Sequence, residues 1–298
     1  MKPIDVVLLT ESRYVNPTTV NHYTHNILTE DSLVQNALEA NGLTVLRLDW
    51  ADQDFDWTNT KLALFRTTWD YFNRISEFSR WLESASMKTK FVNDIELIRW
   101  NMDKHYLRDL QKSGINATPT VYIEQEERVT LKEIVSSSGW DEVVLKPCIS
   151  GGGRHTYRFL KDRTNEYETV FQELIAVEAM MVQQFQRNVI GQGEIALMII
   201  DGTFTHAILK KARDGEFRVQ DDFGGSVHPH SPTKEEIAFA ERVISVCQIP
   251  PLYARIDVVK DNDGNLSVIE LELIEPEMWF RFNPSAAERL ADAVRRRL

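Results

Sequence analysis

The stretch YARIDVVKDNDGNLSVIELELIEP, residues 253–276, predicts two strands joined by a tight turn. Apolar and β-branched residues alternate with polar ones on both sides of the turn residues DNDG, which is the pattern of a β-hairpin. If Asp261 pairs with Leu266, the alternation sends one set of side chains toward a core. This apolar set is Ile256, Val258, Ile269, Leu271 and Leu273.

The opposite face of the hairpin carries carboxylates and one arginine. Asp257 lies opposite Glu270 in this pairing. Arg255 lies opposite Glu272. Cross-strand Cβ atoms are only about 4.5–5.5 Å apart, so like charges there need a cation or abundant water, and removing one carboxylate should raise the melting temperature. Mg²⁺ accepts such ligands and completes its shell with water and phosphate, which indicates a nucleotide site. A solvated face on which Arg255 offsets the charge is the alternative.

Composition limits the classes of function. The 298 residues exceed one ordinary core and fit two or three closely packed lobes. A net charge of −11 argues against a nucleic-acid-binding surface. The chain has no apolar run long enough to span a membrane, and its start turns acidic too early for a signal peptide. Cys148 and Cys247 fit reduced thiols, so we expect a cytoplasmic protein without membrane or nucleic-acid partners.

The first third of the chain predicts an open α/β sheet. Residues 4–9 and 44–48 are apolar runs typical of buried strands, and residues 31–40 have helical spacing. The connection over residues 11–28 is long and polar, and loops of this length are usually functional. We therefore expect this connection to carry substrate contacts.

A third strand, residues 62–65, runs into the segment RTTWDY at residues 66–71. Ligands of open α/β sheets bind at the carboxyl ends of the strands, so Arg66 is a candidate anion clamp. A surface ion pair between Arg66 and Asp70 is the alternative.

A glycine loop follows another predicted strand. Residues 143–147, VVLKP, form a strand that breaks at proline, and SGGGR follows at residues 150–154. Glycines let backbone N–H groups approach phosphate oxygens. The loop is not a Walker A loop, because GK[ST] is absent and a strand follows it. A plain β-hairpin turn would have the same sequence.

Further elements are predicted in the remaining chain. Residues 101–114 predict a helix that carries Lys104, and residues 180–185, MMVQQF, predict a strand. Two capping boxes, at residues 233–236 and 285–288, predict helix starts.

A second hairpin precedes the main basic cluster. Residues 194–200 and 203–210 flank an Asp-Gly turn. The basic cluster is Lys210, Lys211, Arg213 and Arg218. Opposite the carboxylates, it would hold phosphate between cations and metal. A solvated charged loop is the alternative for Lys211 and Arg213.

These motifs, in this order over residues 100–275, resemble the ATP-grasp superfamily. The resemblance implies an α/β fold of α+β lobes with an N-terminal Rossmann-like pre-ATP-grasp domain at residues 1–98. It implies a small lobe with the glycine loop at residues 99–185 and a C-terminal lobe with the metal hairpin at residues 186–298. ATP would be held between the lobes with one or two Mg²⁺ ions, for which Mn²⁺ could substitute.

The resemblance also implies roles for residues at matching positions. The ATP-binding residues would be Lys104, Lys146, Gly151, Gly152, Gly153, Gln183, Gln184, Phe185 and Glu194. The metal ligands would be Asp257, Glu270 and Glu272. Lys210, Arg255 and Arg218 would serve catalysis, and Arg66, Tyr71, Gln220, Gly224 and Gly225 would bind the substrate. Most relatives have Glu-x-Asn at the hairpin, so Glu272 either binds a second Mg²⁺, is protonated or pairs with Arg255.

Four segments, RTTWDY, RWNMDKHYL, FRVQDDFGG and ELELIEP, are similar to one branch, the ligase that closes the cycloserine ring from O-ureido-D-serine and its uncharacterised relatives. This implies a carboxylate–amine ligase that works through an acyl phosphate and closes a ring within a small amino-acid-like substrate. The alternatives are an intermolecular ligase, similar to glutathione synthetase or a peptide-tailoring enzyme, and an ATP-binding regulatory module. The oligomeric state stays open, with a homodimer as one expectation.

Overall fold

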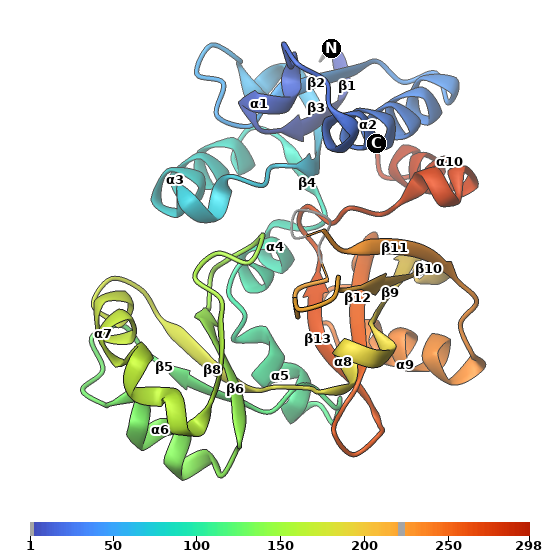
Figure 1. The fold of residues 1–298 in the computed structure, drawn as a ribbon. Coiled ribbons are helices and arrows are strands. Elements are labelled where there is room, and N and C mark those ends of the chain that lie inside the picture. The colour runs from blue at the N-terminus through green and yellow to red at the C-terminus, as the bar shows by residue number, and fades with distance from the viewer. Residues whose placement is uncertain (1–2, 220–223) are drawn as a thin grey trace.

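The N-terminal part of the protein is built on a parallel sheet. The computed structural model describes residues 3–219 and 224–298 (Figure 1). The sheet has the order β2-β1-β3-β4, with β1 (Ile4–Thr10), β2 (Val45–Asp49), β3 (Thr60–Thr67) and β4 (Lys90–Val92). The predicted strands and their shared carboxyl edge are therefore confirmed.

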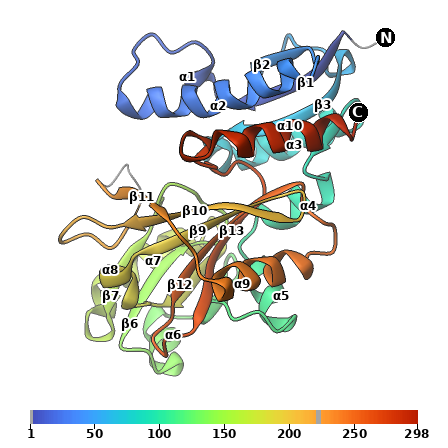
Figure 2. The ribbon, with the colours of Figure 1, turned by 90° about the vertical axis from the view of Figure 1, so that its right-hand side faces the viewer.

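Helices cover both faces of this sheet. Val6 and Leu8 face α2 (His22–Ala40) and the C-terminal α10 (Pro284–Arg295), whereas Val7 and Leu9 face α3 (Ile75–Ser86). Figure 2 shows α10 beside the N-terminal layer, so the chain returns to its first sheet at its end. Short 3-10 helices are η1 (Trp57–Asn59), η2 (Tyr71–Asn73), η3 (Lys161–Arg163) and η5 (Phe280–Phe282).

The long loop expected over residues 11–28 is largely helical instead. The segment contains α1 (Ser12–Val15), and α2 begins at His22. Asn21 caps α2 because its side chain accepts a hydrogen bond from the backbone N–H of Thr24. The first turns of α2 are polar, which hid the helical pattern from sequence analysis. Residues 16–21 form the irregular connection between α1 and α2.

The small lobe is an antiparallel sheet covered by two helices. Its strand order is β5-β8-β6-β7. The elements are β5 (Thr120–Ile123), α6 (Leu131–Ser138), β6 (Glu142–Pro147), β7 (Tyr157–Leu160), α7 (Thr164–Ile175) and β8 (Met180–Gln184). Apolar side chains of α6 and α7 pack on the sheet to form one core. The glycine loop joins β6 to β7, as predicted.

The C-terminal lobe is a five-stranded antiparallel sheet with the order β11-β10-β9-β12-β13. Its elements are α8 (Asn188–Gln192), β9 (Glu194–Ile200), β10 (Thr203–Lys211), β11 (Ser226–His230), α9 (Lys234–Ser245), β12 (Tyr253–Lys260) and β13 (Leu266–Glu272). Helices α5 (Tyr106–Lys112) and α9 cover one face. Among the described residues, no helix is both long and apolar enough to cross a bilayer.

Two helix predictions need correction. The helix expected over residues 101–114 is interrupted, because α4 (Ile95–Asn101) ends before a turn and α5 starts at Tyr106. Lys104 therefore lies in the turn. The capping box at residues 233–236 is confirmed, but α10 begins with Pro284 after Asn283, and the box at residues 285–288 does not form.

The hairpin of β12 and β13 contains a bulge that sequence analysis did not predict. Arg255 pairs with Glu272 and Asp257 with Glu270, as expected. The register then shifts by one residue, so that Lys260, not Asp261, pairs with Leu266. The carboxylate of Asp261 accepts the backbone N–H groups of Asp263 and Asn265, which closes a longer loop.

The bulge changes the direction of one side chain. Ile269 was expected in the core with the other apolar residues of the hairpin. It packs instead against a separate cluster that contains Phe185, Val219 and Val259. A bulge re-aims a side chain in this way because two residues of one strand oppose one residue of its partner. Ile269 and Glu270 therefore both reach the same pocket.

Candidate active site

Two cavities meet at the glycine loop. We name the first the lobe pocket, because it lies between the small lobe and the C-terminal lobe; its residues include Lys104, Lys146, Ser150, Gly151, Gly152, Gly153, Gln184, Phe185, Glu194, Phe217, Arg218, Ile269 and Glu270. The second, the domain cavity, has a volume of about 910 Å³ and adjoins the N-terminal domain. Its residues include Arg13, Tyr14, Trp69, Phe72, Asn73, Gly151, Gly152, Arg154, Lys210, Arg255, Glu272, Glu275, Glu277 and Trp279.

The glycine loop borders both cavities. Gly151 and Gly152 line each of them. A Cβ atom on Gly151 would lie 2.5 Å from Cε1 of Phe72, so only glycine allows the loop to approach the N-terminal domain this closely. Gly152 has a φ of +56°, which also favours glycine. The loop thus forms a shared wall where a group in one cavity can face a group in the other.

The three carboxylates of the hairpin converge at the same boundary. Oxygens of Asp257, Glu270 and Glu272 lie within 4.8 Å of one another. Glu270 borders the lobe pocket, Glu272 borders the domain cavity, and Asp257 is buried between them. Carboxylate oxygens at this spacing are a donor set that suits Mg²⁺.

Cations of the protein neutralise these carboxylates. Lys210 Nζ lies 2.9 Å from Asp257, and Lys104 Nζ lies 3.2 Å from Glu270. Arg255 donates to both Asp257 and Glu272. The face therefore does not depend on a metal or on water to relieve like-charge repulsion, and the expected rise in melting temperature on removing a carboxylate loses its physical basis.

Burial and these cations set the pKa values of the carboxylates. Burial raises the pKa of Asp257, but Arg255 and Lys210 outweigh it, so the net pKa is lowered. The same balance, with Lys104 as the main cation, lowers the pKa of Glu270. Burial dominates at Glu272 and raises its pKa to about 7 despite Arg255.

Two further titratable groups of the lobe pocket are shifted. Burial lowers the pKa of Lys146 to about 8, although the charge of Glu270 opposes this. Burial also raises the pKa of Glu194 to about 6, against the opposing charge of Lys210, with which it forms an ion pair. Perturbed groups gathered in a cleft are typical of functional sites.

Most residues predicted to bind ATP line the lobe pocket. Gln183 does not, because its side chain donates to the hydroxyl of Thr120 at 2.9 Å. Gln184 and Phe185 line it instead. Arg218, expected in the catalytic group, borders the lobe pocket and pairs with Glu216. Lys210 and Arg255 border the domain cavity, as a catalytic role would require.

The predicted substrate residues are placed elsewhere. Arg66 is only 1% exposed, lies 3.7 Å from Asp31, and stacks over Phe280. The surface pair with Asp70 is wrong, because Asp70 binds Arg74 and the indole of Trp50.

The other predicted substrate residues do not line the cavity either. Tyr71 is buried in the core of the N-terminal domain, where its ring packs against Phe78. Neither Gly224 nor Gly225 borders the described part of either cavity. Gln220 lies outside the described residues.

Sequence analysis missed several residues of the domain cavity. Trp279 packs its ring 5.0 Å from the guanidinium of Arg255 and 5.6 Å from Lys210. Trp69 donates its indole N–H to the backbone of Glu275. Trp69 stands in the segment RTTWDY, which was singled out, but no pattern tied it to Trp279. The two tryptophans are more than two hundred residues apart in the chain, and only folding brings them to the wall of one cavity.

Comparisons with known proteins cover most of the chain. Residues 6–93 match the family described as the N-terminal domain of D-cycloserine synthetase DcsG. Residues 110–273 match the family described as the ATP-grasp domain of prokaryotic glutathione synthetase. The chain is 28% identical over 270 residues to the cycloserine biosynthesis protein DcsG of Streptomyces lavendulae, across 86% of this chain and 90% of that protein.

Solved structures show the same fold. The crystal structure of D-cycloserine synthetase DcsG matches with a TM-score of 0.87 and 25% identity, over 98% of this chain and 99% of that chain. A RimK domain ATP-grasp protein from Sphaerobacter thermophilus matches with a TM-score of 0.69 and 19% identity, over 97% and 98%. D-alanine–D-alanine ligase from Bacillus anthracis, complexed with ATP, matches with a TM-score of 0.67 and 15% identity, over 98% and 96%.

Proposed function

The chain belongs to the ATP-grasp family, because residues 110–273 match the ATP-grasp domain of prokaryotic glutathione synthetase, and we propose that it joins a carboxylate to an amine through an acyl phosphate. The membership confirms the expected superfamily, the α/β ATP-grasp fold and the assignment as a carbon–nitrogen ligase. It also sets aside the regulatory module. The proposed domain division stays at residues 1–98, 99–185 and 186–298.

One observation supports this proposal most strongly. Glu270 borders the lobe pocket and Glu272 borders the domain cavity, yet their carboxylates lie within 4.8 Å of each other and of Asp257. A nucleotide in the lobe pocket would present its terminal phosphate at this boundary. An acceptor in the domain cavity would then approach that phosphate from the other side.

We assign the chemical roles accordingly. Lys104, Lys146 and the backbone of the glycine loop hold phosphate oxygens. Asp257, Glu270 and Glu272 would hold one or two Mg²⁺ ions, which neutralise the charge of the transferred phosphoryl group. Lys210 and Arg255 face the acceptor and stabilise the negative charge that develops on its oxygens.

The domain cavity fits a small zwitterion. Its wall carries the cationic side chains of Arg13, Arg154, Lys210 and Arg255 and the carboxylates of Glu272, Glu275 and Glu277. Groups of both signs suit a substrate with an ammonium and a carboxylate. Its relative DcsG is named for cycloserine biosynthesis. We therefore propose ring closure within an O-ureido-D-serine-like amino acid as the reaction.

Product analysis and kinetics test this function. With ¹⁸O in the substrate carboxylate, the acyl-phosphate route transfers label to the released phosphate and yields ADP, whereas AMP and pyrophosphate would refute it. Ring closure predicts saturation in a single amino acid plus ATP. An absolute requirement for a second, amine-bearing substrate would refute ring closure and support the intermolecular ligase.

A further inference from the structure

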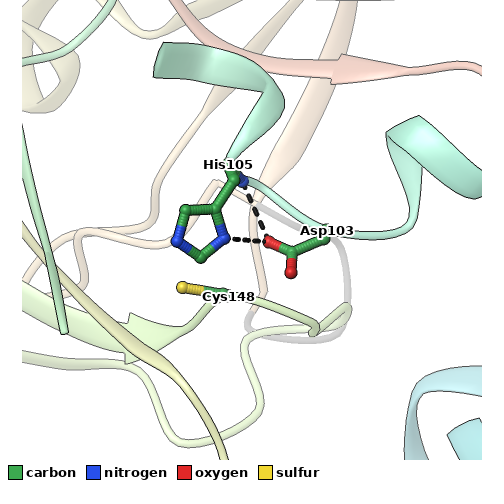
Figure 3. A group of neighbouring side chains, drawn as sticks. All are labelled: Asp103, His105 and Cys148. Atoms are coloured by element: carbon green, nitrogen blue, oxygen red, sulfur yellow. Dashed lines mark hydrogen bonds and ion pairs between the residues drawn. The ribbon is translucent and has the colours of Figure 1, made fainter. Parts of the chain in front are cut away.

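A second group of potential metal ligands, separate from the hairpin carboxylates, lies where the turn between α4 and α5 meets the end of β6. Ligand atoms of Asp103, His105 and Cys148 lie within 4.8 Å of one another. Asp103 and His105 belong to the turn between α4 and α5, and Cys148 directly follows β6. Figure 3 shows the sulfur of Cys148 alongside the imidazole ring, with the carboxylate of Asp103 on the other side of the ring.

The imidazole is held in a defined orientation. Asp103 Oδ1 lies 2.5 Å from Nδ1 of His105 and also accepts the backbone N–H of His105 at 3.0 Å. The ring stacks on Tyr122, with centroids 4.4 Å apart. A carboxylate on Nδ1 leaves Nε2 as the nitrogen available to another partner, which is the usual arrangement behind a metal-bound histidine.

The nitrogen so oriented lacks a hydrogen bond. Nε2 of His105 is buried and makes no hydrogen bond within the described residues. A carboxylate oxygen of Glu124 lies 3.3 Å away. A buried polar atom without a hydrogen bond is costly, and such atoms in native folds call for an explanation such as an ion. The exposed side chain of Glu124 leaves a route by which an ion could enter.

We propose that His105 Nε2, Cys148 Sγ and Glu124 bind a divalent cation of the Zn²⁺ class, with Asp103 orienting the histidine and water as the fourth ligand. Nitrogen, sulfur and carboxylate oxygen are the ligands that Zn²⁺ takes in proteins, whereas Mg²⁺ prefers oxygen alone. Ligands of one tetrahedral Zn²⁺ lie about 3.5 Å apart. The 3.3 Å between Glu124 and His105 Nε2 already matches this spacing, and the sulfur of Cys148 lies within 4.8 Å of a ring nitrogen of His105.

The site would stabilise the segment that holds the phosphate-binding lysines. Lys104 lies between Asp103 and His105, and its backbone N–H donates to the carbonyl of Cys148 at 2.9 Å. Lys146 precedes Cys148 by two residues. Burial raises the pKa of the Cys148 thiol, so the metal must displace a proton from it. Binding would therefore release protons and join three chain segments beside the lobe pocket, those of His105, Glu124 and Cys148.

Cobalt titration of the full-length chain tests this site. Co²⁺ is added to the reduced protein in excess Mg²⁺, which occupies the hairpin carboxylates. We expect one equivalent to produce a thiolate-to-cobalt charge-transfer band, which Zn²⁺ then abolishes. Cys148→Ser should lose the band, and Asp103→Asn should weaken Co²⁺ binding by about 10- to 100-fold.

Cys247→Ser is the matched control, because Cys247 is also a buried thiol but belongs to no such group among the described residues. It should keep the band. Melting curves show whether each variant folds. If Cys148→Ser does not fold, His105→Asn gives a second test of the same site. The proposal is overturned if the wild type shows no band, if folded Cys148→Ser or His105→Asn retains it, or if Cys247→Ser loses it.

Discussion

The lobe pocket and the domain cavity differ in how they are assembled. The lobe pocket is lined by short segments that each carry a recognisable pattern, such as the glycine loop and the end of β8. The domain cavity is lined by one contiguous segment, residues 13–24, which lies in the connection expected to carry substrate contacts, and otherwise by scattered residues such as Trp69, Arg255 and Trp279. The comparison teaches that sequence patterns reveal the contiguous segments of a site, and reveal little of the scattered side chains that complete it.

The largest expected effect falls on the boundary between the two cavities. Asp257→Asn removes the buried charge that Lys210 and Arg255 share, and leaving these cations uncompensated should cost about 3–5 kcal/mol of unfolding free energy. The melting temperature should therefore fall, and ligase activity should be lost. Chemical denaturation and an ADP-release assay measure the two effects.

Asp263→Asn, in the exposed turn of the same hairpin, is the control and should change neither quantity. A rise in the melting temperature of Asp257→Asn would show that repulsion among the carboxylates outweighs their pairing.

A variant confined to the lobe pocket should affect nucleotide binding alone. Lys146→Ala should weaken ATP binding by about 1.5–3 kcal/mol, the range for a hydrogen bond to a charged group, which is roughly tenfold to a hundredfold in Kd. Trp279→Phe, in the domain cavity, should leave the ATP Kd unchanged and raise KM for the amino-acid substrate. Calorimetry measures the ATP Kd of each variant, and steady-state kinetics measures its KM for the amino-acid substrate.

Lys112→Ala removes an exposed lysine paired with Asp109 and serves as the control. Normal ATP affinity in a folded Lys146→Ala variant would remove this lysine from the phosphate site.

A smaller effect should follow from crowding the shared wall. Gly151→Ala places a Cβ atom against the ring of Phe72, and overpacking of this kind costs about 1–3 kcal/mol. Because Gly151 borders both cavities, the apparent affinities for ATP and for the amino-acid substrate should both weaken.

Adding Phe72→Leu to the Gly151→Ala variant should restore part of the lost affinity, since it removes the ring atoms that the new Cβ atom contacts. Gly191→Ala is the matched control, because a Cβ atom there meets nothing within 4 Å. Unchanged affinities in Gly151→Ala would mean that the ring moves aside without consequence.

The smallest effect concerns pH and the N-terminal domain. Burial raises the pKa of Glu11 from 4.5 to about 7, although Arg13 opposes this. The folded state therefore favours the protonated form of Glu11. The contribution of this form to the free energy of unfolding is present below pH 4.5 and is lost as the pH rises through 7. Glu11→Gln should gain stability relative to the wild type at pH 8, on the order of 1 kcal/mol, and little at pH 4.5.

Melting curves across this pH range measure the difference. Glu83→Gln, on the surface of α3, should show no such pH dependence. A difference between Glu11→Gln and the wild type that is constant with pH would contradict the assignment.

The sequence alone determined the elements whose signals are local. The strand pattern of β1, the capping box at residues 233–236 and the pairing of Asp257 with Glu270 all follow from residues close in the chain. The order of the ATP-grasp motifs predicted the family. These features were predictable because backbone geometry and side-chain alternation act over a few residues.

Only the tertiary structure decided which charged groups pair and where individual side chains point. The bulge that turns Ile269 toward the lobe pocket depends on how the loop closes on Asp261. The pairing of the carboxylates with Lys104 and Lys210 joins residues far apart in the chain. Arg66 followed the strand pattern but is buried against Asp31. Long-range packing selects such contacts, because burial and charge depend on neighbours that no local pattern specifies.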